Sequence, residues 1–186
     1  DEVKTVTAGI TDNKAKIAKI YDYLKSKMAW NEYQGTFVTT SLKDAYKEGK
    51  GSTADINLTL IGMLRQAGLT ADPVLLSTKG HGFLNEAFPS LRQFNYVIAR
   101  VEVAEGKHML LDATDKDLPM HLLPTKCIND QGLLVREEGI KWVDLKPTGK
   151  YNLTRAFELS LNEDLEWEGI MKVRCKDYAA TSMRED

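Results

Sequence analysis

The chain has 186 residues, a length that suits one domain or one domain with part of a neighbour. Hydrophobic residues make up 42% of it, which is enough for a sizeable core and argues against a disordered chain. The formal net charge of -2, with acidic and basic residues interspersed, argues against the clustered basic surface of a nucleic-acid-binding protein. No apolar run approaches the roughly 20 residues that cross a bilayer, so we expect no membrane span.

The first predicted elements are helical. Residues 11–29 place apolar side chains at spacings of three and four, which predicts an amphipathic helix capped by Thr11 or Asp12. Residues 31–40 are polar and aromatic and are predicted to form a loop. A short helix is expected over 41–48, capped by its serine and stopped by the glycine that follows it.

The next segment is the most apolar of the chain. A turn at 50–53 opens into a helix that is apolar nearly all round and ends before Gly68, which predicts a buried central helix. Gly62 lies inside it at a cost of about 1 kcal/mol relative to alanine, which suggests close packing against a neighbour. Asp55 near the start and Arg65 near the end are explained by charge complementarity to the helix dipole.

Beyond this helix the apolar period changes from 3.6 to 2, which predicts strands. Pro73 stands near the start of the first strand, as expected for an edge strand or for the first residue of a strand. Long irregular segments are predicted at 80–93 and 115–131. The predicted strands are 72–76, 94–103, 108–112, 133–135 and 141–145.

The character of the sequence shifts after residue 147. Residues 157–175 alternate apolar and charged side chains, which predicts a β-hairpin with one apolar face. We therefore expect a main domain over 1–147 and a hairpin segment over 148–186 that begins a following β module. The predicted fold class is α+β, with helices first and then an antiparallel sheet.

Three motifs in this order carry a resemblance to a known family. They are Gly-Ser-Thr-Ala-Asp at 51–55, Phe-Asn-Tyr-Val-Ile at 94–98 and Asp-Ala-Thr at 112–114, and the end of the central helix at 63–69 fits the same pattern. Over roughly residues 12–135 the chain resembles the transglutaminase-like domain of the papain-like superfamily. It is most similar to the bacterial multidomain envelope proteins in which β-rich modules flank this domain.

The resemblance implies a degenerate catalytic triad. In the family a cysteine starts the central helix, a histidine opens a strand and an aspartate ends the next strand. Here these positions hold Thr53, Tyr96 (with Asn95 as the alternative occupant) and Asp112. A threonine hydroxyl ionises far less readily than a thiol, and a tyrosine with a pKa of about 10 is protonated at neutral pH and is no general base. The resemblance therefore implies a pseudoenzyme, a non-catalytic module that binds or scaffolds.

The alternative is a thiol-independent hydrolase or acyl transferase that uses Thr53 with a recruited base. His81 is the candidate base, because it lies between glycines in a long loop that could reach the cleft. Cys127 is weighed as a relocated nucleophile, but it follows no turn-to-helix start. The third alternative is a purely structural domain without an exposed groove. Burial of Thr53 under packed side chains would favour it.

The expected ligands follow from the same resemblance. Trp30, His81 and Asn95 are the candidate binding residues for a peptide, a glycan or a partner protein. Trp30, with Tyr33 and Phe37, either lines a groove or closes the core, and we favour the core. Three scattered histidines lack the spacing of a zinc site, so we expect no metal and no cofactor.

The compartment and the state of the cysteines are considered last. The resemblance to envelope proteins points to an extracytoplasmic location, in the periplasm or cell envelope. Cys127 and Cys175 are far apart in sequence and are either two free thiols or one disulfide.

Overall fold

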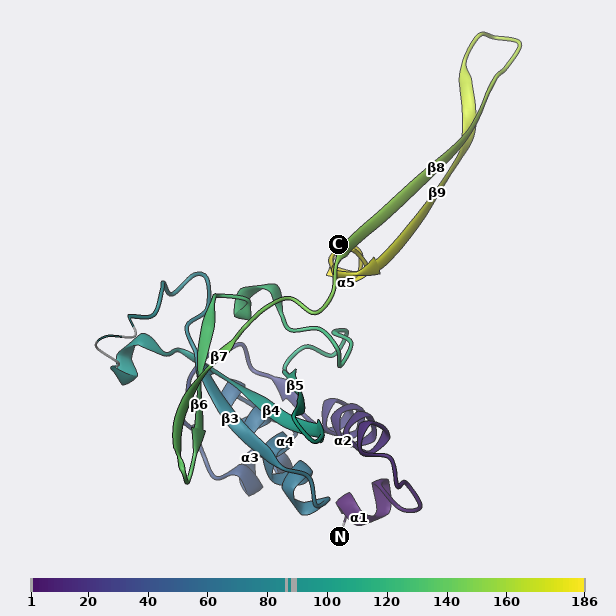
Figure 1. Ribbon diagram of the computed structural model, residues 1–186. Helices are drawn as coiled ribbons and strands as arrows, with labels where there is room; N and C mark the ends of the chain where they lie inside the picture. Colours follow the sequence, from purple (N-terminus) through teal and green to yellow (C-terminus); the bar gives the residue numbers. More distant parts are fainter. Residues whose placement is uncertain (1, 86, 88–89, 186) are drawn as a thin grey trace. The chain divides into compact units, whose positions relative to one another are not determined.

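A computed structural model describes residues 2–85, 87 and 90–185. The chain divides into two compact units, unit 1 (Asp1–Pro147) and unit 2 (Thr148–Asp186), which Figure 1 shows as ribbons. Helices and a mainly antiparallel sheet confirm the predicted α+β class. In the described part of the chain, no helix is long and apolar enough to cross a membrane.

Unit 1 combines helices with two sheets. Its α-helices are α1 (Glu2–Val6), α2 (Asn13–Lys27), α3 (Leu42–Glu48) and α4 (Thr53–Gln66), and two 3-10 turns are η1 (Leu91–Gln93) and η2 (Thr125–Cys127). A small parallel pair joins β1 (Ala29–Trp30) to β2 (Lys50–Gly51). The main strands are β3 (Ala71–Leu76), β4 (Tyr96–Ala104), β5 (Lys107–Leu111), β6 (Gln131–Arg136) and β7 (Gly139–Asp144).

The N-terminal helices follow the predicted signals closely. Asp12 caps α2 by accepting a hydrogen bond from Ala15, and Ser41 caps α3 in the same way. Gly49 ends α3 with a left-handed φ of 69°, a conformation that glycine adopts without steric cost. No sequence signal predicted α1, whose buried Val3 packs into the core.

The main sheet has the strand order β5-β4-β3-β6-β7, and every pair is antiparallel. The expectation of an edge or first-residue position for Pro73 is therefore wrong, because β3 is the central strand. Pro73 is nonetheless accommodated: β6 pairs only with Val74 and Leu75, so the ladder on that side begins after the proline.

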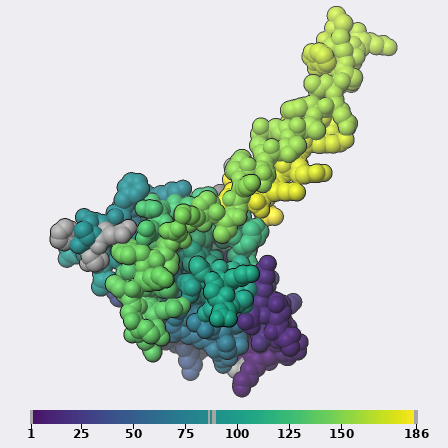
Figure 2. All heavy atoms as spheres, viewed as in Figure 1, coloured from purple at the N-terminus to yellow at the C-terminus, as the bar shows by residue number. Residues whose placement is uncertain are grey.

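Each face of the main sheet has its own core. Helix α4 covers one face, where Leu60, Leu64, Val101 and Leu111 belong to one buried cluster. The opposite face carries a second cluster that includes Ile98 and residues of the segment between β5 and β6. In Figure 2 that segment and the strands β6 and β7 form much of the visible green surface of unit 1.

The predicted close packing of Gly62 against a neighbour is wrong. This residue is exposed, and a Cβ built at this position meets no atom within 4 Å, so no close packing requires the glycine. We expect Gly62→Ala to raise the free energy of unfolding by about 1 kcal/mol, since alanine is the better helix former. Urea unfolding measures this gain, and a loss of stability would show that the helix needs the bare backbone here.

Unit 2 is a hairpin with a terminal helix. Strands β8 (Tyr151–Leu161) and β9 (Trp167–Asp177) pair along eleven residues each, longer than predicted, and the unpredicted α5 (Tyr178–Glu185) packs on both. One face of the hairpin is apolar, as expected, and its large side chains are exposed; they include Phe157, Leu159, Leu161, Trp167 and Met171.

Candidate functional site

The start of α4 is fixed by a capping box. The N-cap Ser52 accepts a hydrogen bond from the Asp55 N–H and donates its own backbone N–H to the Asp55 carboxylate at 2.9 Å. Thr39 donates to the same carboxylate through its N–H at 3.0 Å and its hydroxyl at 2.6 Å. Burial tends to raise the pKa of Asp55, but the hydrogen bonds from Thr39 and Ser52 outweigh burial and lower it. Asp55 therefore ties the 31–40 loop to the helix, which dipole complementarity alone did not predict.

This carboxylate predicts a pH-dependent stability. At pH 7 we expect Asp55→Asn to lower the free energy of unfolding by about 1–3 kcal/mol, because several hydrogen bonds to the charged group are lost. A lowered folded-state pKa means that the contribution is complete above the unfolded pKa of about 4 and is lost as the pH falls through the folded value. The difference between wild type and variant should therefore shrink between pH 7 and pH 3.

Urea unfolding at both pH values measures this difference. Asp44→Asn is the matched control, because Asp44 holds the equivalent place in α3 but is exposed. An undiminished difference at pH 3 for Asp55→Asn would contradict the assignment.

Thr53, the first residue of α4, is fully buried, and its polar groups are hydrogen-bonded to the backbone. Its N–H donates to the carbonyl oxygen of Tyr33 at 3.1 Å, and its hydroxyl donates to the same oxygen at 3.2 Å. The indole N–H of Trp30 also donates to that oxygen, at 3.1 Å. Three donors thus converge on one carbonyl oxygen, which is the arrangement that enzymes use to hold a developing oxyanion.

Tyr96 and Asp112 form a buried pair at the end of the sheet where β4 begins and β5 ends. Tyr96 opens β4, and its hydroxyl donates to the Asp112 carboxylate at 2.7 Å while lying 3.0 Å from the hydroxyl of Thr114. The other carboxylate oxygen accepts from the Thr114 N–H and from the Asn57 side chain, both at 3.0 Å. Burial first, and then the charge of Asp112, raises the pKa of Tyr96, so the phenol stays protonated.

Asn57 connects the two halves of the site and was missed as a site residue. It lies one turn beyond Thr53 on α4, donates to the Val97 carbonyl as well as to Asp112, and accepts from the Ala113 N–H. The sequence offered one signal: an asparagine in a helix that is otherwise apolar nearly all round needs buried partners. The Asn-Leu-Thr motif that begins there is accordingly not an exposed glycosylation site, because Asn57 is fully buried.

Two further residues close over this network. The Cys127 thiol is fully buried 3.9 Å from the Asp112 carboxylate, and burial followed by that charge raises its pKa, so it is a thiol and no nucleophile at neutral pH. The Lys126 ammonium lies 4.1 Å from the ring centre of Trp30 and 4.8 Å from that of Tyr96. Cys127 and Cys175 are both free.

The predicted binding residues have other partners. Trp30 belongs to the site through Tyr33 and Lys126, as described. The Asn95 side chain accepts from the Thr78 N–H and donates to the Thr78 hydroxyl, both at 2.8 Å, and so shapes the loop before β4. The His81 ring lies 3.2 Å from the Arg92 carbonyl in the same loop. In the part of the chain that the structure describes, no hydrogen bond joins His81 to the triad positions.

The loop aromatics depart from the expected core. Tyr33 is 59% exposed and Phe37 70% exposed, whereas Trp30 is half-buried and packs on the core below α4. The reason is the path of the 31–40 loop, which Thr39 anchors to Asp55 at one end and the Tyr33 carbonyl anchors to Thr53 at the other. These anchors hold the backbone and leave the two rings in solvent.

A separate cavity lies on the outer side of α4. Its volume is about 490 Å³, its walls come from α1, α3 and α4, and its lining includes Gly62 and Tyr46 but none of the triad positions. Among the described residues, no group of three histidine, cysteine or acidic side chains is placed to hold a metal ion.

The chain is similar to known proteins over most of unit 1. The family model "Transglutaminase-like superfamily" matches residues 2–113, which is more than half of the chain and spans Thr53, Tyr96 and Asp112. Comparison with curated proteins gave no match. A crystal structure of a putative protease from Parabacteroides distasonis ATCC 8503 has a similar fold, with 15% identity, a TM-score of 0.56 and 77% of this chain covered. The present chain spans 26% of the length of that protein. The match over residues 2–113, together with the shared fold, shows that the chain belongs to the transglutaminase-like superfamily.

Proposed function

We propose that the chain is a non-catalytic transglutaminase-like module that acts as a scaffolding or binding domain. The observation that carries this proposal is the hydrogen bond from the Tyr96 hydroxyl to the Asp112 carboxylate. The superfamily resemblance implies an imidazole at position 96, which would take a proton from the nucleophile. A phenol with a raised pKa donates its proton to the aspartate and accepts none from Thr53.

The occupied donors at the start of α4 support the same conclusion. An acyl-transfer enzyme keeps such donors free for the substrate oxygen. Here the Thr53 N–H and the Trp30 indole already bind the Tyr33 carbonyl, and Thr53, Tyr96 and Asp112 are each fully buried. These residues thus serve the stability of the fold, and the full burial of Thr53 favours a structural role over a peptide groove at this position.

The hydrolase alternative has no comparable support. The Thr53 hydroxyl is committed to the Tyr33 carbonyl, and the His81 ring is associated with the Arg92 carbonyl. A recruited base must reach the nucleophile within about 2.6–3.2 Å. Both side chains would have to leave their present partners before such a pair could form.

The partners and the location are proposals of the same kind. We propose that the domain spaces or binds β-rich modules of the same protein or a partner protein, peptide or glycan outside the cytoplasm. The support is the resemblance to flanked envelope domains, and the separate hairpin unit with its exposed apolar face is compatible with a β-rich neighbour.

Thr53→Ala tests the absence of catalysis. We expect neither wild type nor variant to release ammonia from glutamine side chains, or an amine from peptide bonds, above the rate without protein. We also expect partner binding to be unchanged, because the hydroxyl faces the Tyr33 carbonyl and not solvent. Turnover by the wild type that Thr53→Ala abolishes would overturn the proposal. Glu163→Ala, a change at an exposed position of the β8–β9 turn, is the control for preparation effects.

A further inference from the structure

A cluster of charged residues occupies the sheet face opposite α4. Arg100 lies in β4, where its neighbours Ala99 and Val101 pack toward α4. Side chains alternate along a strand, so Arg100 shares the opposite face with Ile98. It is paired across the ladder with Asp72 of β3.

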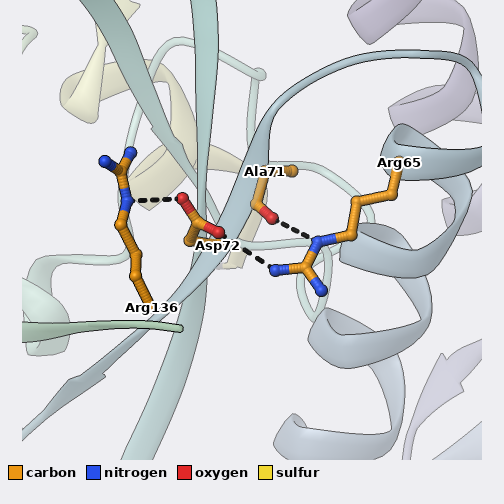
Figure 3. Close-up of polar contacts among 4 residues, drawn as sticks. All are labelled: Arg65, Ala71, Asp72 and Arg136. Carbon is orange, nitrogen blue, oxygen red and sulfur yellow. Dashed lines mark hydrogen bonds and ion pairs between the residues drawn. The ribbon is translucent and has the colours of Figure 1, made fainter. Parts of the chain in front are cut away.

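The carboxylate of Asp72 is already taken by two other arginines. Arg65 donates to one of its oxygens at 3.0 Å and Arg136 to the other at 2.7 Å, as Figure 3 shows. Arg65 also donates to the Ala71 carbonyl at 2.6 Å. Arg65 is therefore explained by this ion pair, and not only by the helix dipole as the sequence suggested.

Arg100 is left without an acceptor for two of its nitrogens. Its Nε and Nη1 atoms are buried and have no hydrogen-bond partner within the described part of the protein. Buried donors are almost always paired, and an unpaired one points to a missing water, ion or ligand. A charged guanidinium makes this shortfall more costly than a neutral donor would.

The surroundings of Arg100 are rich in cations. The charged groups near it are Arg136, Asp72 and Glu102, and those near His108 of β5 include Arg100, Arg136, Glu102 and Lys141. Burial and then Arg136 lower the pKa of Arg100, and burial, Arg100 and Arg136 lower that of His108. The cluster therefore holds four permanent cations and two carboxylates. The cations are Arg65, Arg100, Arg136 and Lys141, and the carboxylates are Asp72 and Glu102.

We propose that this cluster is a binding site for an oxyanion, a phosphate or carboxylate group, with Arg100 as its principal donor. The planar fork of a guanidinium matches the paired oxygens of both groups. Arg100 as a whole is only half-buried, and His108 and Lys141 at the rim are exposed. For a ligand to reach the buried nitrogen atoms of Arg100, these rim side chains would have to change rotamer. The site is independent of the proposed function.

Thermal unfolding with inorganic phosphate or citrate, against sodium chloride at equal ionic strength, provides the first test. We expect at least one of the two anions to raise the Tm of the wild type by about 3 °C or more at ten times its Kd. Arg100→Gln should abolish this rise, and Arg155→Gln, which removes an exposed arginine of β8, should retain it. A response to phosphate alone assigns a phosphoryl ligand, and a response to citrate alone assigns a carboxylate.

The His108 ring supplies a second test that needs only the wild type. An anion bound beside it should raise its pKa in an NMR titration, because it offsets the charges of Arg100, Arg136 and Lys141 while Glu102 stays in place. Arg100→Lys, which keeps the charge and loses the fork, should weaken binding about tenfold or more. Absence of both the Tm rise and the His108 shift overturns the proposal, as does an equal rise in Arg100→Gln.

Discussion

Replacing Asp112 by alanine is expected to lower the free energy of unfolding by about 3–5 kcal/mol, the largest effect of any polar substitution in unit 1. The reason is that its carboxylate accepts buried hydrogen bonds from Tyr96, Asn57 and Thr114, and the Cys127 thiol contacts it at 3.9 Å. Each donor left without a partner costs about 1–3 kcal/mol, and the three costs do not add fully because the groups share one network.

The measurement is chemical denaturation of the full chain with two comparison variants. Asp112→Asn should be less damaging than Asp112→Ala, since the amide keeps one acceptor for the Asn57 or Thr114 donor. Glu105→Ala removes a carboxylate from the exposed β4–β5 turn and should change stability by less than about 0.5 kcal/mol. Equal effects of Asp112→Ala and Glu105→Ala would mean that the buried network contributes nothing to the fold.

The double variant Thr53→Cys/Tyr96→His should show the largest effect on reactivity. We expect its new thiol to react with iodoacetamide at pH 7 about tenfold faster than the thiol of Thr53→Cys alone, because an imidazole held by Asp112 favours the thiolate, whereas the positive end of α4 acts on both thiols alike. Both variants keep the same burial and the same Tyr33 carbonyl, so the comparison isolates the imidazole.

The background for this experiment is Cys175→Ser, which removes the more exposed of the two native thiols. Cys127 is replaced by alanine in the same background, because its thiol and the Tyr96 hydroxyl contact the same Asp112 oxygen, so the new imidazole would act on it as well. Equal rates for the single and double variants would show that positions 53 and 96 are not neighbours. The inference of a degenerate triad would then lose its geometric basis, although the family membership would stand.

Local sequence signals were sufficient for most of the elements. The helix ends at Asp12, Ser41 and Gly49 are set by residues within three positions of them, so they are readable from the sequence alone. The strand Tyr96–Ala104 and its hairpin partner follow from period-two alternation. In the same way, the order of three short motifs was enough to identify the superfamily, which the match over residues 2–113 confirms.

Features that depend on tertiary contacts were not readable. The position of β3 at the centre of the sheet is set by the strands that pair with it, so the edge position predicted from Pro73 was wrong. Likewise the roles of Asp55 and Arg65 are decided by Thr39 and Asp72, which are remote from the helix ends in question. The pairing of Tyr96 with Asp112 was suggested by family resemblance alone. No motif predicted the contacts of Lys126, and Asn57 was marked only as a polar residue in an apolar helix.

The setting of Trp30 has an optical consequence. Its indole N–H donates to the Tyr33 carbonyl of the loop that covers Thr53, and the Lys126 ammonium of η2 lies 4.1 Å from its ring centre, so the edge of this fluorophore senses that loop and its face senses η2. Displacement of that loop must change the local field at the ring and hence the emission wavelength. With Trp142 and Trp167 replaced by phenylalanine, Trp30 would be the one tryptophan left in the chain, and its emission would report the position of the loop that covers Thr53.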